Sequence, residues 1–360
     1  KFNTYRMSLS YSPITSEFIS QLKNLMGEAF VLTQQSELAA YAQDETEDLT
    51  YFPEVVVKPH TAEEISQVLK WCNQYNVPLT PRGAGTGLSG AALPIYGGLL
   101  LSMERFNSIL EIDEQNLQAR VQSGVITEAF MNAVEEKGLY YPVDPSSKGS
   151  CFLGGNVAHG SGGPRVVKYG TIREYILNLK VVLPTGEIIW TGANTLKFAS
   201  GYNLTQLFIG SEGTLGIVTE IVVKLIPKPA QNVLLLASFT SNEHACEAVS
   251  AIFRDGNNPS AVEFIEKEAV DWVVKYEHLT IQINPQAKAF LLIEVDGNDL
   301  DLLMNDCEKI SNVLMNYQAE DILFADSAQQ KEDFWRMRRS IALSVKANSI
   351  YKEEDTVVPR

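Results

Sequence analysis

The sequence predicts a mixed α+β protein with two main domains, and three observations lead to this expectation. The chain has 360 residues, of which 45% are hydrophobic, and this is enough for more than one core. Short apolar runs of strand length cluster between residues 55 and 226. After the boundary signal Pro227, Lys228, Pro229, longer strands and helices alternate.

The first cluster begins with an apolar strand at residues 55–59, and a helix is expected at residues 61–76. Thr61 and Glu64 have the T-x-x-E spacing of a capping box. One face of the helix is apolar, with Ile65, Val68, Leu69 and Cys72. The next expected elements are strands at 77–80, 99–103, 109–112 and 119–122 and a helix at 127–137.

Residues 144–169 are rich in Gly and Ser and show neither a helical nor a strand period, so we expect a long loop there that is either functional or disordered. Strands follow at 176–183 and 187–191, joined by the turn signal Pro-Thr-Gly. Residues 217–226 have a strongly strand-like pattern. The sequence thus predicts a region of clustered strands that are connected by glycine-rich loops.

The second domain is expected to alternate strands and helices. Strands are predicted at 233–239, 261–265 and 289–295, and helices at 243–253, from 266 to 276, and at 299–317. The last helix has a single apolar stripe of Leu303, Cys307, Ile310 and Leu314. The expected domains are an N-terminal helical segment at 1–54, a first domain at 55–229 and a second at 230–360.

The overall charge excludes some partners. The chain has 29 basic and 44 acidic residues, a formal net charge of −15, which argues against nucleic acid or an anionic membrane surface. The four cysteines form no C-x-x-C pair, which fits a reducing, cytoplasmic setting. No window approaches the roughly 20 apolar residues of a membrane span, and no signal-peptide core is seen.

The most informative segment is PRGAGTGLSGAALP, which contains a G-x-G-x-x-G at Gly85, Gly87 and Gly90. A Rossmann motif needs a helix to start within the loop, and Pro94 with the glycines after it excludes that helix. The alternative is an irregular nest of backbone N–H groups, open also at Gly83, which suits a diphosphate. A glycine-rich turn that only reverses the chain remains possible.

Two further loops have little side-chain bulk, at residues 154–163 and 210–216. Backbone there can pack closely against a flat ring system. Either loop alone could be an ordinary surface loop. Three such loops in one domain indicate a large cofactor.

These segments carry a resemblance to a known family. The strings PRGAGTGLSGAALP, DPSSKGSCFLGGNVAHGSGGPRVVKYG, VVLPTGEIIWTG and GYNLTQLFIGSEGTLGIVTEIVVKLIPKP resemble the FAD-binding domain of the vanillyl-alcohol-oxidase (PCMH) type. Within that superfamily they are most similar to the FAD-linked D-2-hydroxy-acid group of glycolate oxidase FAD-binding subunits, D-lactate dehydrogenases and D-2-hydroxyglutarate dehydrogenases. The resemblance implies a two-subdomain FAD-binding domain followed by a substrate (cap) domain.

The resemblance also implies which residues hold FAD. They are Pro81, Arg82, Gly83, Ala84, Gly85, Thr86, Gly87, Leu88, Pro145, Ser146, Gly154, Asn156, Gly162, Glu212, Gly213 and Ile217. The first loop has no histidine or cysteine for covalent attachment, so FAD is expected to be noncovalent. Cys151 is expected to be a packed thiol. His159 is expected to be either a neutral neighbour of the cofactor or a base. No metal ligands are assigned.

Substrate contacts are expected from residues 334–345, taken as one helix. One apolar stripe contains Phe334, Met337, Ile341 and Val345, and Arg338 falls inside it. A guanidinium there needs an anion, either a substrate carboxylate or an internal Asp or Glu. The W-x-x-R spacing resembles the family's carboxylate-binding arginine, although Ala342 stands where some relatives have threonine. Lys352 resembles a second carboxylate contact or is a solvated lysine.

The resemblance implies oxidation of a D-2-hydroxy acid, with electrons passed to partner subunits or a quinone, in the cytoplasm or at the inner face of a membrane through partners. The family's histidine base comes from an H-x-G-D-G-N-x-H segment, which these 360 residues lack. We therefore expect the sequence to be truncated, and to bind FAD without efficient turnover. The alternatives are another alcohol substrate, a reductive role, or a non-catalytic FAD-binding electron-relay subunit.

Overall fold

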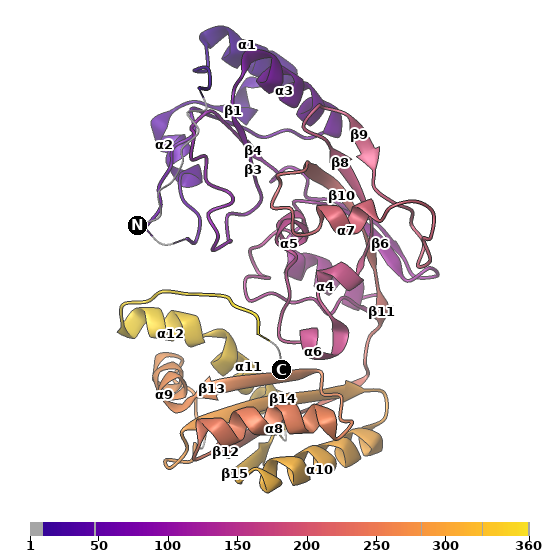
Figure 1. Cartoon of the computed structure of the whole chain (residues 1–360), viewed down its shortest axis with the longest axis vertical. Helices are drawn as coiled ribbons and strands as arrows, with labels where there is room; N and C mark the ends of the chain where they lie inside the picture. Colours follow the sequence, from indigo (N-terminus) through magenta and orange to yellow (C-terminus); the bar gives the residue numbers. More distant parts are fainter. Residues whose placement is uncertain (1–9, 47, 282, 326, 359–360) are drawn as a thin grey trace. The chain divides into compact units, whose positions relative to one another are not determined.

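The computed structural model describes residues 10–46, 48–281, 283–325 and 327–358, and it divides into two compact units (Figure 1). The first unit comprises Lys1–Tyr141, Ser147–Ser161 and Ile172–Pro227. The second comprises Pro142–Ser146, Gly162–Thr171 and Lys228–Arg360. The second unit thus takes two short segments from the part of the chain expected to form the cofactor domain. The α+β class is confirmed.

The first sheet of the first unit has the order β1-β2-β4-β3. Its strands are β1 Val31–Leu32, β2 Val55–Val57, β4 Leu99–Ser102 and β3 Leu79–Arg82. Strands β2 and β3 both pair with β4 in parallel, which requires crossovers, and helix α3 (Ala62–Tyr75) lies between β2 and β3 in the chain. The N-terminal segment contributes helix α1 (Ser16–Met26) as expected and also a strand, because β1 pairs with β2.

Helix α3 begins where its capping sequence predicts. The Thr61 Oγ1 atom accepts a hydrogen bond from the Glu64 N–H at 3.1 Å. The Glu64 carboxylate accepts from the His60 N–H at 2.6 Å, one residue before the expected partner. The first interaction satisfies an N–H group that the helix start leaves without a partner, and the second fixes the residue before the cap.

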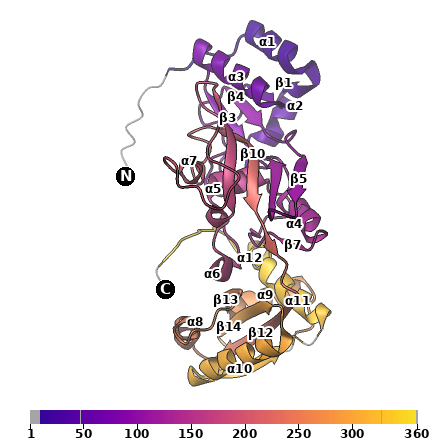
Figure 2. The ribbon, with the colours of Figure 1, turned by 90° about the vertical axis from the view of Figure 1, so that its right-hand side faces the viewer.

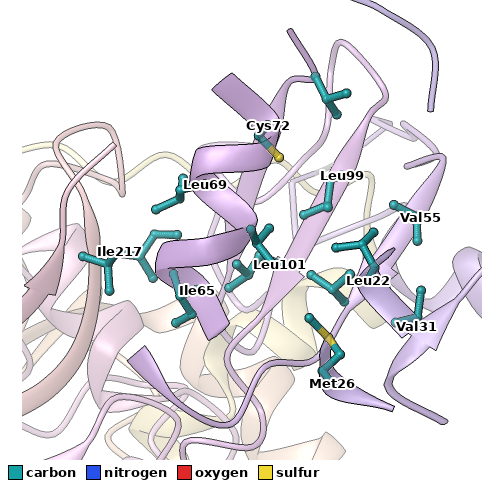
Figure 3. Packing of buried hydrophobic residues seen from close by; sticks show 14 of the residues in the cluster. Leu22, Met26, Val31, Val55, Ile65, Leu69, Cys72, Leu99, Leu101 and Ile217 are labelled. Atoms are coloured by element: carbon teal, nitrogen blue, oxygen red, sulfur yellow. The ribbon is translucent and has the colours of Figure 1, made fainter. Parts of the chain in front are cut away.

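The core of this sheet is formed by one face of α1 and one face of α3 (Figure 3). The labelled side chains are Leu22, Met26, Val31, Val55, Ile65, Leu69, Cys72, Leu99, Leu101 and Ile217. The apolar face predicted for residues 61–76 is therefore the buried face. Burial also raises the pKa of the Cys72 thiol to about 12.

The second sheet of the first unit is antiparallel, with order β5-β6-β10-β8-β9. Its strands are β5 Ile109–Asp113, β6 Gln118–Gln122, β10 Ile217–Lys224, β8 Ile176–Val182 and β9 Ile188–Trp190. The expectation of one strand at 217–226 is wrong at its end. A separate strand, β11 (Ile226–Pro227), pairs with β7 (Leu139–Tyr140).

The expectation of a loop without helices at 144–169 is wrong. Helices α5 (Leu153–His159) and α6 (Val166–Tyr169) lie within it. Helix α5 contains two glycines, each of which disfavours a helix by roughly 0.5–1 kcal/mol relative to Ala. Burial of Leu153 and Val157 stabilises it, so tertiary packing outweighs the local propensity.

The second unit has an antiparallel sheet of order β13-β14-β12-β15. The strands are β13 Ala261–Glu266, β14 Ala289–Gly297, β12 Gln231–Phe239 and β15 Ala319–Phe324. Alternate residues of β12 and β14 enter two separate cores, as the period of two in a strand requires. Figures 1 and 2 show α8 (Asn242–Arg254) and α10 (Leu300–Asn316) on one face, and α9 (Lys267–Tyr276) and α11 (Ala328–Arg339) on the other.

The expectation of one helix over residues 334–345 is wrong. Helix α11 ends at Arg339, and α12 (Ile341–Asn348) begins after Ser340, whose φ and ψ are −92° and 5°. Phe334 and Met337 are buried as predicted. The apolar stripe does not continue as one straight face, because Ser340 leaves the helical conformation. Within the described ranges, no helix is both long and apolar enough to cross a membrane.

Candidate functional site

The first unit contains a pocket where its three glycine-rich segments meet. It holds about 680 Å³ of space, part of it open to solvent. The lining residues come from the first glycine loop, from the region around α5 and from the segment that leads into β10. They are Pro81, Arg82, Gly83, Ala91, Ala92, Met103, Ser123, Gly154, Gly155, Ala158, His159, Phe208, Ser211, Glu212, Gly213, Gly216, Ile217 and Val218.

The first glycine loop begins directly after β3 and contains no helix before β4. The rejection of a Rossmann motif is therefore confirmed. Gly85 and Gly90 have φ values of +76° and +71°, a conformation that favours glycine. A Cβ atom at Gly85 would lie 2.2 Å from the Arg82 Nη2 atom. The loop folds over the arginine that precedes it.

Arg82 is a buried cation in the pocket wall, with 7% of its surface exposed. Its Nη2 group donates to the Gln43 carbonyl at 2.8 Å, and its guanidinium lies 5.8 Å from the centre of the Tyr41 ring. Burial lowers the pKa of Arg82, and the nearby Asp44 charge opposes this effect. Among the described residues, Nη1 has no hydrogen-bond partner. A buried donor of this kind suits an anionic ligand.

In the second glycine segment, Gly154 lies so close to its neighbours that a side chain is excluded at this position. A Cβ atom at Gly154 would lie 2.5 Å from the Ser123 Cβ and 2.8 Å from its carbonyl oxygen. A Cβ atom at Gly83 would lie 3.7 Å from the Cα of Gly155. The first two glycine segments therefore pack backbone against backbone. The buried Ser123 Oγ, also in the wall, has no hydrogen-bond partner among the described residues.

The third glycine segment, residues 210–216, closes the pocket. Gly213 has a φ of +76°, and a Cβ atom there would lie 2.7 Å from the Pro81 Cγ. Glu212, with a φ of +50°, holds an unusual backbone conformation for a residue with a side chain. Arg173 anchors the start of the segment, since its Nη2 donates to the Ile209 carbonyl at 2.9 Å.

The structure assembles part of the predicted cofactor set. Pro81, Arg82, Gly83, Gly154, Glu212, Gly213 and Ile217 all line the pocket. Ala84, Gly85, Thr86, Gly87 and Leu88 follow in the same loop. Pro145, Ser146 and Gly162 belong to the second unit. The contacts of all these residues with FAD remain predictions.

Asn156 is placed differently from the other predicted residues. It is 4% exposed and is absent from the pocket lining. Its Oδ1 accepts from the Thr127 hydroxyl at 2.5 Å, and its Nδ2 donates to the Cys151 sulfur at 3.3 Å. Cys151 is likewise a buried, packed thiol. The side chain of Asn156 therefore connects α5 to Thr127 and Cys151 in the interior of the unit.

Several lining residues escaped the sequence analysis, among them Ser123, Phe208 and Val218. Ser123 precedes Gly124, and a Cβ atom at Gly124 would lie 2.3 Å from the Met103 carbonyl oxygen. Gly124 was therefore the one sign in the sequence that the backbone is closely packed beside Ser123. Phe208 and Val218 lie in ordinary apolar runs, which carry no sign of a pocket.

The predicted substrate residues lie in the second unit. The Arg338 Nε donates to the Glu263 carboxylate, which is the internal pairing that the sequence analysis left open. The Arg338 side chain is still 32% exposed. Lys352 is 76% exposed and lies 2.5 Å from the Glu354 carboxylate. Neither observation tests substrate binding.

The second unit also contains a buried ionic network that the sequence analysis missed. Arg165 donates to both Glu294 oxygens, from Nε at 3.0 Å and from Nη2 at 3.2 Å, and to Asp144 from Nη1 at 2.6 Å. Its guanidinium lies 5.2 Å from the centre of the Trp335 ring. Glu294 is 1% exposed. This network holds the segment after α5 on strand β14.

The pocket of the first unit fits a large anionic cofactor with a flat ring. Its walls are backbone at several points where a Cβ atom would collide with a neighbour. A buried guanidinium with an unused donor lies in its wall. These features match what the diphosphate and the ring system of FAD require.

Comparisons with known proteins agree with this site. Residues 53–192 match the family model described as FAD binding domain, and residues 228–360 match the model described as FAD linked oxidases, C-terminal domain. The glycolate oxidase subunit GlcD of Bacillus subtilis (strain 168) is 41% identical over 351 residues, which are 96% of this chain and 73% of that protein. D-lactate dehydrogenase of Anaerostipes hadrus is 37% identical over 97% of this chain and 74% of that protein.

Solved structures support the fold alone. The 4-ethylphenol oxidase of Gulosibacter chungangensis has a TM-score of 0.73 at 19% identity, with 92% of this chain and 70% of that chain covered. For p-cresol methylhydroxylase the TM-score is 0.69 at 19% identity, with 89% and 68% covered. The expected fold class is confirmed. This chain belongs to the family of FAD-linked oxidoreductases that includes these glycolate oxidase and D-lactate dehydrogenase relatives, and FAD is its cofactor.

Proposed function

We propose that this enzyme oxidises a D-2-hydroxy acid of the glycolate or D-lactate type to the 2-oxo acid, with noncovalent FAD. The observation that carries the proposal is the similarity to relatives named for these activities along almost the whole chain. D-2-hydroxyglutarate dehydrogenase of Stutzerimonas stutzeri, 32% identical over 94% of this chain and 73% of that protein, has the same substrate class in its name.

Arg338 is the proposed anchor for the substrate carboxylate. Its Nε is engaged by Glu263, and no described residue forms a hydrogen bond with its Nη groups. A guanidinium that one carboxylate already orients can present its remaining donors to a second carboxylate. Lys352 is the proposed second cationic contact, and its exposure leaves it accessible.

The chemistry divides between the cofactor and the protein. When bound, FAD supplies the two-electron acceptor that oxidation of an alcohol carbon requires. The residues of this chain bind and orient: Arg82 and the glycine segments hold the anionic part of FAD, and Arg338 holds the substrate. Removal of the hydroxyl proton needs a base, and we assign that role to none of the four histidines.

Electron transfer to a partner is the second part of the proposal. The relatives from Bacillus subtilis and Escherichia coli are named as subunits of glycolate oxidase. A partner subunit or a quinone would take the electrons from the reduced protein. We also propose a cytoplasmic location, which fits the four free cysteines.

Anaerobic mixing tests the substrate class. The full-length protein with FAD bound is mixed without oxygen with D-lactate, L-lactate, glycolate or D-2-hydroxyglutarate, and the visible flavin band is followed. We expect at least one D-acid or glycolate to bleach the band and L-lactate to leave it unchanged. Bleaching only by L-lactate or by uncharged alcohols would contradict the proposal. A flavin that no substrate reduces would favour an electron-relay subunit.

The role of Arg338 has a matched control in the same helix. In the Arg338→Lys variant we expect KM for the acid to rise about tenfold or more with a smaller change in kcat, because lysine cannot form two parallel bonds. Arg339→Lys alters an exposed arginine that pairs with Glu332, and should change neither constant. An unchanged KM in Arg338→Lys would remove Arg338 from the proposed site.

A further inference from the structure

His159 lies where the three glycine segments of the first unit meet. It is the last residue of α5 and lines the pocket. A Cβ atom at Gly87, in the first segment, would lie only 2.8 Å from the His159 Nε2. The His159 Nδ1 lies 3.7 Å from the Glu212 Oε1 in the third segment. One imidazole thus contacts the other two segments at once.

The Glu212 carboxylate extends this contact. Its Oε1 atom also accepts a hydrogen bond from the Ser89 hydroxyl at 3.5 Å. The side chains of His159 and Glu212 are 35% and 44% exposed, so protons from solvent reach both. A continuous line of polar contacts therefore runs from the first glycine loop, through Glu212, to the end of α5.

The charged groups around His159 come from three other elements. Glu212 faces it from the third segment, and Arg82 lies in the same pocket wall at the end of β3. Arg173 approaches from the side, since its Nη2 would lie 3.7 Å from a Cβ atom at Gly160, the next residue. Glu212 places a negative charge beside the imidazole, and the two arginines bring positive charges to the same region. Among the side chains of the pocket wall, only imidazole ordinarily changes charge between about pH 5 and pH 8.

We propose that His159 is a positioning residue that couples FAD binding to proton uptake. Protonated His159 holds the Glu212 carboxylate, orders the first glycine loop at Gly87 and adds a positive charge to a pocket that receives an anionic diphosphate. The FAD complex therefore binds more protons than the free protein, and linkage then requires the affinity for FAD to rise as the pH falls. The proposal rests on FAD as the cofactor and not on the identity of the substrate.

The pH profile distinguishes this role from simple packing. If His159 only fills space, its replacement should weaken FAD binding by the same factor at every pH. If His159 couples FAD binding to proton uptake, its replacement should remove the dependence of FAD affinity on pH. The neutral amide in His159→Asn fills part of the same space and still donates a hydrogen bond, so this variant separates the charge from the shape.

The experiment measures the dissociation constant of FAD for the apoprotein at pH 6.0, 7.0 and 8.5, by quenching of flavin fluorescence. For the unaltered protein we expect about tenfold tighter binding at pH 6.0 than at pH 8.5, the scale of one charge-assisted hydrogen bond. His159→Asn and His159→Gln should bind at every pH about as the unaltered protein does at pH 8.5. Glu212→Gln should reduce the slope, because a neutral amide no longer stabilises the imidazolium.

His60→Asn is the matched control. His60 is an exposed histidine of the same unit, whose Nδ1 lies 3.3 Å from the Arg105 carbonyl oxygen, and it does not line the pocket. This variant should keep the full slope. A slope that persists in both His159 variants, or that is absent from the unaltered protein, overturns the inference while FAD binding itself stands. Failure of the unaltered protein to bind FAD at any pH would overturn the cofactor assignment as well.

Discussion

Two arginines, one in each unit, show how differently the two parts of this protein use charge. Arg165 in the second unit donates from Nε, Nη1 and Nη2 to two carboxylates and stacks on Trp335. Arg82 in the first unit is buried, yet its Nη1 has no hydrogen-bond partner among the described residues. Buried donors are normally satisfied, so the exception needs an explanation.

The difference separates structure from ligand binding. The donors of Arg165 are used inside the protein, so the arginine serves to hold one segment of chain on a sheet. Arg82 lies in a pocket wall that includes five glycines, and its Nη1 donor has no partner among the described residues. A saturated arginine stabilises the fold, whereas an unsaturated one in a pocket is prepared for an anion.

The largest effect is expected from breaking the saturated pair. Arg165→Ala leaves the buried Glu294 carboxylate without its bidentate partner, and we expect the free energy of unfolding of the second unit to fall by about 3–5 kcal/mol. Urea denaturation, followed by tryptophan fluorescence because Trp335 adjoins Arg165, measures it. Arg339→Ala, at an exposed pair, should cost about 0–1 kcal/mol. Equal losses of stability in the two variants would show that Arg165 is no more important to the fold than an exposed arginine.

Two neighbouring glycines sharpen the description of the pocket. Gly154→Ala places a methyl group against Ser123 backbone atoms, so both stability and FAD affinity should fall, the affinity by about a hundredfold or more. A Cβ atom at Gly155 meets no neighbour within 4 Å. Gly155→Ala should therefore keep or slightly raise apoprotein stability, because alanine favours the helix, and should still weaken FAD binding. Thermal unfolding and FAD titration of both variants measure this contrast.

Unchanged FAD affinity in Gly155→Ala would mean that this side of α5 does not face the cofactor. If Gly155→Ala lost as much stability as Gly154→Ala, a Cβ atom at Gly155 would have to meet a neighbour, contrary to the open space around it.

A smaller effect is expected at Arg82. Arg82→Gln removes a buried charge whose desolvation already lowers its pKa. The apoprotein should therefore lose little stability, while the dissociation constant for FAD rises roughly 10- to 100-fold, as loss of a charge-assisted hydrogen bond implies. Thermal unfolding and FAD titration of the same sample measure the two quantities. A variant that loses stability without losing affinity would give Arg82 the structural role that we assign to Arg165.

The smallest effect concerns the thiols of both units. Burial raises the pKa of Cys72 to about 12 and that of Cys307 to about 11, so both stay protonated and unreactive at pH 8. Cys151 is buried as well, and Cys246 is exposed. A thiol-reactive dye should label one cysteine quickly in the native protein and four after denaturation. Rapid labelling of Cys151 would show that the region of α5 opens in solution.

The sequence was sufficient for the elements with strong local patterns. The apolar face of α3, the alternation in β12 and β14 and the absence of a helix after Gly90 could all be read directly. Such patterns depend on the few residues nearest in the chain. The helix break at Ser340 and the formation of α5 could not be read in this way, because tertiary packing outweighed weak local preferences there.

By itself, the sequence determined the α+β class, the three glycine segments and their resemblance to an FAD-binding domain, since glycine spacing is a local constraint on the backbone. Only the tertiary structure decided which further residues, such as Ser123 and Phe208, complete the pocket wall. It turned Asn156 toward Thr127, brought His159 beside Gly87 and Glu212, and gave Arg165 its buried partners. Along the chain, Thr127 and Asn156 are 29 residues apart, His159 and Glu212 are 53 apart, and Arg165 and Glu294 are 129 apart. Contacts at such separations follow from packing of whole elements, which no local pattern records.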